Sequence, residues 1–335
     1  MNIGVVGATG MVGEVFMKIL GESRLRVKNL RPFASDKSAG QKISACNREW
    51  TVETLKPNCF SGLDLVFFSS GDDISKTWAP QAVESGAFAV DNSAAFRMDP
   101  RFPLIVPEVN GDLLKKIRQP TIIANPNCST IQLVVVLKAL QSFGLKRVRV
   151  ATYQSVSGAG KPGRDELMQQ VQEQVRGAPL SQPATFPHPI AFNCIPQIGS
   201  FNEEGFCSEE VKIMNETKKI MSLPELMVSA FTVRIPSLNA HSEAAWVTFA
   251  KDVSRSEIYS ALENAAGIKF FPDTKTSQYP TALAASGEHP VFVGRVHKDL
   301  AEPNTWMMWI VADNILKGAA LNGLQIAEEI FVTHS

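Results

Sequence analysis

Cys128 is the cysteine whose surroundings best suit nucleophilic chemistry. It lies in Asn-Pro-Asn-Cys-Ser-Thr, residues 125–130, after an apolar run that predicts a strand and before one that predicts a helix. At a helix N-terminus, amide donors and the helix dipole stabilise a thiolate and lower the thiol pKa from about 8.5. The other cysteines, at 46, 59, 194 and 207, form neither a zinc pattern nor a disulfide framework. The sequence therefore predicts one reactive thiol, no metal site and a reducing cytoplasm.

A nucleophilic thiol needs a base, and the chain has five histidines. His334 is close to the C-terminus, and His188 and His289 are each next to proline. Two candidates remain. His297 ends an expected strand, and His241 lies in a turn between two expected strands. The residue pattern alone leaves His241 open between a base and a surface-loop imidazole.

The glycines of Gly7-x-x-Gly10-x-x-Gly13 follow the first expected strand and open the first expected helix. Glycines at such a turn let the backbone approach a pyrophosphate closely, while the helix N-terminus offers amide donors. The spacing differs from the G-x-G-x-x-G form, but the position indicates a dinucleotide site. After the second expected strand, Asp36 suits a free ribose 2′-hydroxyl, whereas Lys37 with Ser35 and Ser38 suits a 2′-phosphate. This favours NADP(H) over NAD.

Short apolar runs that alternate with helical segments must position these residues. In the first 127 residues this pattern predicts βαβ units and a parallel sheet, that is, a Rossmann-type dinucleotide-binding domain. The expected strands there are 2–7, 27–34, 63–68, 88–91, 104–107 and 121–124, and the expected helices are 12–20 and 74–84.

From residue 128 the pattern changes to a buried helix, 129–140, followed by longer strands. These strands, expected at 147–155, 227–235, 243–250, 291–297 and 306–312, predict an α+β domain with a largely antiparallel sheet. A proline-rich stretch, 177–197, marks an extended connector. The last helix, 319–331, is expected to pack back on the first domain. We therefore expect one domain from 1–127 with 315–335, and a catalytic and dimerisation domain from 128–314.

Composition excludes several classes of protein. The chain has 335 residues, of which 33 are basic and 33 acidic, and 44% are hydrophobic. A net charge of zero lacks the cationic surplus of a general nucleic-acid binder, so no nucleic-acid partner is expected. The apolar run 131–137 is interrupted by Gln132 and is far shorter than the ~18 residues of a membrane span. No membrane partner is expected either.

Four motifs in order resemble aspartate-semialdehyde dehydrogenase. They are Gly-Ala-Thr-Gly-Met-Val-Gly at 7–13, Asn-Pro-Asn-Cys-Ser-Thr at 125–130, Tyr-Gln-Ser-Val-Ser-Gly-Ala-Gly at 153–160, and Arg-Ile-Pro to His-Ser-Glu at 234–243. The resemblance extends to Lys-Gly-Ala-Ala at 317–320 and covers nearly the whole chain. It implies reductive dephosphorylation of L-aspartyl 4-phosphate to L-aspartate 4-semialdehyde and phosphate, in amino-acid biosynthesis, by a cytoplasmic homodimer.

The resemblance also implies residue roles. Cys128 would form an acyl-thioester, His241 would be the general acid/base, and Gln154 would orient the substrate. The implied substrate contacts are Arg234 for the α-carboxylate, Glu209 for the α-ammonium group, Arg97 and Lys212 for the phosphate, and Asn127 for an oxyanion. The implied NADP contacts are Gly7, Thr9, Gly10, Met11, Val12, Gly13, Lys37, Ser38, Ser157, Gly158 and Asn314.

Several alternatives stay open at this point. The family commonly reads the 2′-phosphate with Arg-Ser, and the point charge of Lys37 leaves strict NADP preference undecided. The residues alone do not separate Glu209 from Glu210, and only the motif alignment favours Glu209. N-acetyl-γ-glutamyl-phosphate reductase is the nearest rival, although its substrate has a blocked amine and its usual motif has Gly where this chain has Asn127. A cysteine hydrolase or acyltransferase without hydride transfer, and a non-catalytic NADP sensor, are the other rivals.

Overall fold

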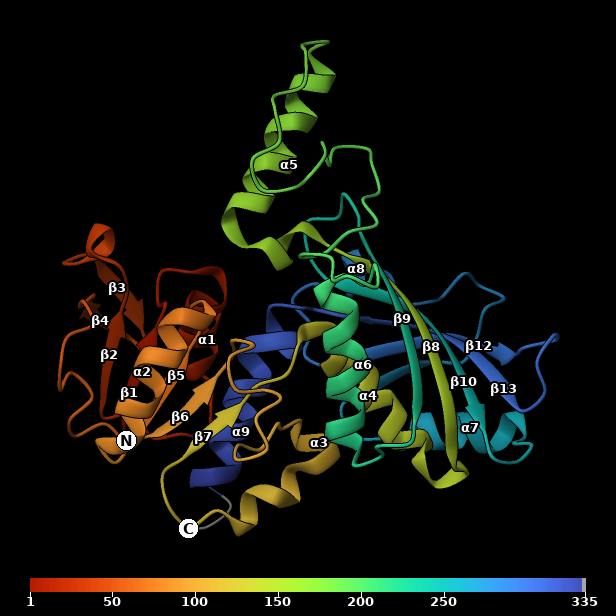
Figure 1. The fold of residues 1–335 in the computed structure, drawn as a ribbon, viewed down its shortest axis with the longest axis horizontal. Helices are drawn as coiled ribbons and strands as arrows, with labels where there is room; N and C mark the ends of the chain where they lie inside the picture. Colours follow the sequence, from red (N-terminus) through yellow and green to blue (C-terminus); the bar gives the residue numbers. More distant parts are fainter. Residues whose placement is uncertain (333–335) are drawn as a thin grey trace. The chain divides into compact units, whose positions relative to one another are not determined.

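The computed structural model describes residues 1–332, so His334 and the end of the expected segment 315–335 lie outside the described residues. The chain divides into two compact units (Figure 1). The first comprises residues 1–127 and the segment from residue 319 onward, and the second comprises residues 128–318. Each unit has its own sheet, and the two are described separately below.

The first unit is built on a parallel sheet with the strand order β2-β1-β5-β6-β7. Its central strands are short and almost entirely buried, as expected for a parallel sheet covered on both faces. This confirms the predicted Rossmann-type architecture. The strands of this sheet are β1 (Asn2–Val6), β2 (Asn29–Phe33), β5 (Leu65–Phe68), β6 (Phe88–Asp91) and β7 (Ile122–Ala124). The unit also contains a hairpin of β3 (Lys42–Ala45) and β4 (Arg48–Thr51). Its helices are α1 (Met11–Leu20), α2 (Asp72–Glu84), α3 (Pro107–Asn110) and α9 (Leu321–Phe331).

Helix α9 belongs to the first unit although it comes last in the chain. Its Gly323 lies so close to Phe67 of β5 that an added Cβ would be 2.4 Å from the Phe67 ring. The same ring stacks on Phe16 of α1, with centroids 4.0 Å apart. Phe67 therefore joins the first and last helices to the central sheet, as expected for the final helix.

The second unit contains a six-stranded sheet with the order β11-β12-β13-β10-β8-β9. Strand β10 pairs antiparallel with β8 and β13, and β12 pairs antiparallel with β13, whereas β8–β9 and β11–β12 are parallel. The sheet is thus mixed rather than purely antiparallel. The elements are α4 (Cys128–Leu140), β8 (Leu145–Gln154), α5 (Gly160–Val175), α6 (Ser208–Met221), β9 (Met227–Arg234), β10 (His241–Phe249), α7 (Arg255–Glu263), β11 (Ile268–Phe271), α8 (Ala282–Ala285), β12 (Val291–Lys298) and β13 (Thr305–Ala312).

Helix α5 and the segment after it form an arm of the second unit that extends away from the sheet (Figure 1). The segment 177–197 contains no helix or strand, as its prolines predict. Its Phe186 and Ile190 are buried in a small cluster with Val156 and Leu167. The connector is therefore irregular but anchored.

The strand expected at 104–107 is wrong. Only Leu104 makes an isolated bridge, to Ala124, and Pro107 begins helix α3. The Asn110 side chain accepts a hydrogen bond from the Val106 N–H at 3.0 Å and donates to the Leu104 carbonyl at 2.9 Å. These bonds occupy backbone groups that a neighbouring strand would otherwise pair.

Within residues 1–332, no helix is both long and apolar enough to cross a membrane.

Candidate active site

Cys128 is the first residue of α4, a helix whose other residues are almost all buried. Its thiol is therefore placed in the first helical turn, where the unpaired amides of the helix lie. Gly318 packs against it so closely that an added Cβ would be 2.8 Å from the Cys128 Cβ. This close approach explains why a glycine stands at residue 318, a role that the sequence alone does not reveal.

Sheet pairing brings three of the predicted residues to one edge of the second sheet. Gln154 ends β8 and pairs with Arg234, which ends the parallel strand β9. His241 begins β10, which runs antiparallel to β8 and pairs Ser242 with Tyr153. The ends of β8 and β9 and the start of β10 meet at the same edge. Topology thus places Gln154 near Arg234 and His241, which follow it by 80 and 87 residues in the sequence.

The guanidinium of Arg234 is buried, only 6% exposed, and donates a hydrogen bond from Nη1 to the Ser155 carbonyl at 2.7 Å. Burial lowers the arginine pKa, while the nearby charges of Glu209 and Cys128 favour its charged form. A buried cation beside the thiol stabilises a thiolate and offers a fork for a carboxylate.

His241 is completely buried, and its Nδ1 is 3.1 Å from the backbone N of Ser155. Burial, followed by the positive charge of Arg234, lowers the pKa of His241 to about 3, against the smaller opposing effect of Glu209. The imidazole is therefore neutral at physiological pH. Its Nε2 has no hydrogen-bond partner among the described residues.

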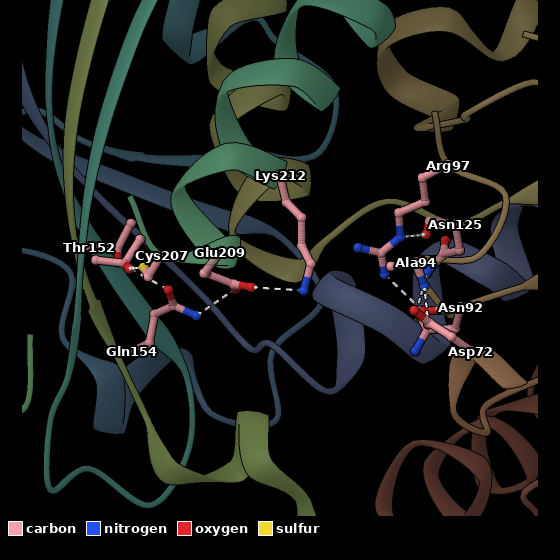
Figure 2. A network of polar contacts seen from close by, with 11 residues as sticks. Asp72, Asn92, Ala94, Arg97, Asn125, Thr152, Gln154, Cys207, Glu209 and Lys212 are labelled. Atoms are coloured by element: carbon pink, nitrogen blue, oxygen red, sulfur yellow. Dashed lines mark hydrogen bonds and ion pairs between the residues drawn. The ribbon is translucent and has the colours of Figure 1, made fainter. Parts of the chain in front are cut away.

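Gln154, Glu209 and Lys212 form a chain of polar contacts within the second unit (Figure 2). Gln154 donates from Nε2 to Glu209 at 3.0 Å and accepts from the Thr152 hydroxyl at 3.1 Å. The other oxygen of Glu209 is 3.5 Å from the ammonium group of Lys212, one turn along α6. Glu209 therefore presents a carboxylate between an amide and a cation.

Glu210 has a different, structural role. One of its oxygens accepts a hydrogen bond from the Cys207 N–H at 2.9 Å, and the other accepts from the Thr232 N–H at 3.0 Å. The first contact is half of a capping box in which Cys207 is the N-cap of α6. Because Glu210 is occupied by the backbone, the geometry favours Glu209 as the carboxylate that faces the site.

Arg97 and Asn127 lie in the first unit. Arg97 is buried and donates from Nε to the Asn125 carbonyl at 3.0 Å and from Nη2 to the Asn92 carbonyl at 2.8 Å (Figure 2). The Asn125 side chain in turn donates to Asn92 at 2.7 Å and accepts from Asn322 at 2.6 Å. This amide network fixes the guanidinium at the C-terminal end of β6 and β7. Asn127 is also buried, two residues beyond Asn125.

The glycine loop lies between β1 and α1 and fits a dinucleotide. Gly7 has a φ of +82°, and an added Cβ would be 2.8 Å from the Ser69 carbonyl. A Cβ at Gly13 would be 2.3 Å from the Gly7 carbonyl, so helix and loop can approach only with glycine there. Gly10 is the N-cap of α1 and makes no side-chain cap. The backbone N–H groups of the first turn, which begins at Met11 and Val12, are therefore available to an anion bound beside Thr9.

Lys37 and Ser38 follow β2 in a short 3₁₀ turn, Asp36–Ser38. Lys37 is exposed and makes no hydrogen bond or ion pair within the described residues. A cation in this place suits an added phosphate group on a ribose. Asp36 precedes it on the same turn, so the structure keeps both candidate groups at the surface.

The other three predicted cofactor contacts lie in the second unit, around His241. Asn314 accepts hydrogen bonds from the hydroxyls of Ser155 and Ser157 at 3.1 and 3.0 Å. A Cβ at Gly158 would be 2.9 Å from Nη1 of Arg234. Sequence reasoning missed Ser155 and the pair Asn239–Asp313, which are joined at 2.7 Å, because only the fold brings them together.

Models of known families match both units. A semialdehyde dehydrogenase NAD binding domain matches residues 2–117, and a semialdehyde dehydrogenase dimerisation domain matches residues 137–317. The curated aspartate-semialdehyde dehydrogenase of Aquifex aeolicus is 44% identical, covering 98% of this chain and 97% of its own. The enzyme of the same name from Bacillus subtilis is 42% identical, covering 98% and 97%.

Solved structures agree with these relatives. A crystal structure of aspartate semialdehyde dehydrogenase II complexed with ASA, from Vibrio cholerae, has a TM-score of 0.95 and 39% identity, covering 100% of this chain and 99% of that one. Aspartate semialdehyde dehydrogenase with NADP from Candida albicans has a TM-score of 0.77 and 25% identity, covering 98% of each chain.

Proposed function

Because the chain belongs to the semialdehyde dehydrogenase family, we propose that it interconverts L-aspartyl 4-phosphate and L-aspartate 4-semialdehyde through a thioester on Cys128, with NADP(H) as cofactor. The observation that carries this proposal is the arrangement within the second unit. A helix-terminal thiol, a buried arginine, a buried histidine and a carboxylate between an amide and an ammonium group surround one edge of a sheet. Its charges complement an amino acid whose side chain is an acyl phosphate.

Each end of the substrate has a matching group. Arg234 would hold the α-carboxylate through its planar guanidinium. Glu209 would hold the α-ammonium group, and Lys212 and Arg97 would hold the phosphate. The Cys128 thiolate, stabilised by the first turn of α4 and by Arg234, would attack the acyl carbon and expel phosphate. Gln154 and Asn127 would orient the acyl carbonyl.

The nicotinamide dinucleotide would bind at the glycine loop of the first unit, whose tight turn requires glycine at residues 7 and 13 because a Cβ there would meet the carbonyl of Ser69 or of Gly7. NADPH would supply the hydride that reduces the thioester. The chain's own part is to hold the pyrophosphate at the N-terminus of α1 and the 2′-phosphate at Lys37 and Ser38. The remaining proposed contacts are Thr9, Gly10, Met11, Val12, Ser157, Gly158 and Asn314.

The choice of NADP over NAD depends on Lys37. Replacing Lys37 with Ala should raise the KM for NADP about tenfold, since one point-charge contact to phosphate is lost. The KM for NAD should change little. Asp36→Ser, at the residue before Lys37, is the control of opposite sign, because removing the carboxylate should lower the KM for NADP. Equal effects of Lys37→Ala on both cofactors would remove Lys37 as the 2′-phosphate contact.

We also propose how the chain assembles and where it acts. A dimerisation domain covers residues 137–317, so we propose a homodimer formed through the second unit, acting on small molecules in the cytoplasm. Sedimentation of the full chain at several concentrations tests the dimer. A species of monomer mass throughout the micromolar range would contradict it.

The function is tested by reducing NADP with L-aspartate 4-semialdehyde, followed at the absorbance of the reduced nicotinamide. Reduction should require phosphate or arsenate, because the thioester must be released by an oxyanion. N-acetyl-glutamate 5-semialdehyde is the matched control, since its amine is blocked and cannot pair with Glu209. Equal or faster turnover of that control, or turnover without any added oxyanion, would overturn the proposal.

A further inference from the structure

Glu209 is held in place by contacts that do not involve Lys212. One of its oxygens accepts a hydrogen bond at 3.0 Å from the side chain of Gln154, which ends strand β8. The next residue along α6, Glu210, accepts from the Cys207 N–H at 2.9 Å in the helix cap, so the first turn of α6 is fixed as well. The carboxylate of Glu209 is therefore a stationary anion.

The ion pair between Glu209 and Lys212 is a looser contact. Its two charged atoms are 3.5 Å apart, whereas a close N⁺–H···O⁻ hydrogen bond measures about 2.7–2.9 Å. The ammonium group of Lys212 reaches Glu209 from one turn along α6, at the end of a flexible stem (Figure 2). Within residues 1–332, this ammonium group makes no other hydrogen bond or ion pair. Lys212 can therefore leave Glu209 without breaking a second contact.

The two members of this pair differ in how much they need a partner. The side chain of Glu209 is 8% exposed, whereas that of Lys212 is 35% exposed. A buried charge without a counter-charge is costly, but water can solvate the ammonium group of a partly exposed lysine. Glu209 therefore depends on nearby cations, and Lys212 supplies one in the protein without substrate. Another cation at the same carboxylate would release Lys212.

Arg234 is a second cation near Glu209, but its own contacts hold it in place. Burial lowers the pKa of Arg234 and the charge of Glu209 opposes this effect, so the two groups interact. The guanidinium donates to the Ser155 carbonyl at 2.7 Å and lies over the ring of Phe186, 5.9 Å from its centroid. Lys212 is therefore the cation of this cluster that is able to move.

We propose that the ammonium group of the substrate replaces Lys212 at Glu209, and that the released Lys212 then binds the phosphate. The inference rests on the proposed function, in which Glu209 takes the α-ammonium group and Lys212 contributes to the phosphate site. One cation is exchanged for another at a fixed carboxylate, so the buried charge keeps a partner and no proton moves. Glu209 thereby determines specificity, because only a substrate with a free amine completes the phosphate site.

This exchange couples the binding of the amine to the binding of phosphate. Without substrate, Glu209 competes with phosphate for Lys212, and the apparent affinity for phosphate is reduced. A ligand with a free amine removes this competition and tightens phosphate binding. Coupling of this kind is reciprocal, so phosphate must tighten the binding of that ligand by the same factor. Aldehydes without a free amine leave Lys212 paired and gain nothing from phosphate.

The coupling is measured by calorimetric titration of the full chain with inorganic phosphate. The protein is saturated with NADP and carries Cys128→Ser to stop turnover. Saturating L-aspartate 4-semialdehyde should tighten phosphate binding ~10-fold, whereas succinate semialdehyde, which differs only in lacking the amine, should change it less than about twofold. No tightening by L-aspartate 4-semialdehyde, or equal tightening by both aldehydes, would overturn the proposal.

A second set of variants separates the release of Lys212 from direct attraction between the amine and phosphate. Lys212→Met keeps the apolar stem but removes the charge, and L-aspartate 4-semialdehyde should then no longer tighten phosphate binding. Without any aldehyde, Glu209→Gln should tighten phosphate binding ~10-fold when Lys212 is present and have little effect together with Lys212→Met. A purely structural role of Glu209 predicts no such gain. Equal gains in both backgrounds would show only the loss of a repulsive charge and would overturn the exchange.

Phosphate-dependent reduction of NADP by the unmodified chain decides the proposed function separately. If turnover is present and the phosphate affinities do not change as stated, the function stands and the exchange is wrong. If turnover is absent, the proposed function fails, whereas Glu209→Gln and Lys212→Met, titrated with phosphate alone, still decide whether Glu209 withholds Lys212 from phosphate.

Discussion

The glycine loop of the first unit and the cluster around Cys128 in the second unit are built in opposite ways. The loop is a continuous stretch, 7–13, and it acts through its backbone and through the absence of side chains. The cluster uses side chains from α4, α6, β8, β9 and β10, which only the fold brings together. A site formed by neighbouring residues can therefore be predicted from the sequence. A site assembled by strand pairing can be predicted only from the topology or from a resemblance to a known family.

The largest difference between the two sites should appear at the nucleophile. Cys128→Ser should lower kcat at least ~10⁴-fold, because a hydroxyl at this site is a far weaker nucleophile than a thiolate. NADP binding and the melting temperature should stay close to those of the unmodified chain. Cys194→Ser, at an exposed cysteine, is the matched control and should retain activity. Comparable rates for the two variants would show that the chemistry lies elsewhere.

The next largest effect should distinguish the roles of two adjacent carboxylates in the cluster, Glu209 and Glu210. Glu209→Gln should lower kcat/KM for L-aspartate 4-semialdehyde ~100-fold with little loss of stability, because an ammonium partner is lost. Glu210→Gln should instead reduce the free energy of unfolding by about 1–2 kcal/mol, because it weakens the α6 cap and the bond to Thr232. Steady-state kinetics and urea unfolding measure the two effects. The reverse pattern would assign the substrate contact to Glu210.

The glycine loop predicts a smaller effect that is steric in origin. Gly13→Ala would place a Cβ 2.3 Å from the Gly7 carbonyl, and the required shift should reduce the free energy of unfolding by about 1–3 kcal/mol and weaken NADP binding. Gly71→Ala is the control in the same unit, because no atom lies within 4 Å of its Cβ position. Chemical unfolding and cofactor titration compare the two. Equal stabilities would show that the loop tolerates side chains.

The smallest effect concerns the acid sensitivity of the cluster. His241 has a folded pKa of about 3 and an ordinary pKa of 6.5, so below pH 6.5 the unfolded chain binds a proton that the folded chain does not. This histidine should therefore reduce the free energy of unfolding by about 1.4 kcal/mol for each pH unit below 6.5. Urea unfolding at pH 7 and pH 5 should show about 2 kcal/mol less acid destabilisation in His241→Gln. The same pH dependence in both proteins would contradict a buried neutral ring.

Much of the fold follows from local pattern, and the exceptions have physical causes. The buried runs that form β1, β5 and β6 are distinct in sequence because a parallel sheet covered on both faces needs continuous apolar strands. The segment 104–107 has the same composition, but Asn110 hydrogen-bonds its backbone and Pro107 starts a helix. The largely antiparallel sheet of the second unit was predicted, but its strand order and its two parallel pairings, β8–β9 and β11–β12, were not, because they depend on contacts between distant residues.

Some residues of the candidate site could also be predicted from the sequence, and others could not. The placement of Cys128 and the glycine loop can be inferred from neighbouring residues, since a strand followed by a helix creates both positions. Glu209 and Glu210 are equivalent in sequence, and only the cap at Cys207 separates them. Asn314 was expected to contact NADP, and its hydrogen bonds to Ser155, Ser157 and Ala240 give it a further place in the support of His241. Such contacts leave no periodic signal.

The central claim is that Cys128 carries the acyl group, and the mass of the protein tests it directly. The full chain is incubated with L-aspartate 4-semialdehyde and NADP without phosphate, quenched in acid and digested, and each cysteine peptide is weighed. We predict an aspartyl adduct on the peptide that contains Cys128, removed when phosphate is added before the quench. An unmodified Cys128 peptide, or an adduct confined to another cysteine, would contradict the account.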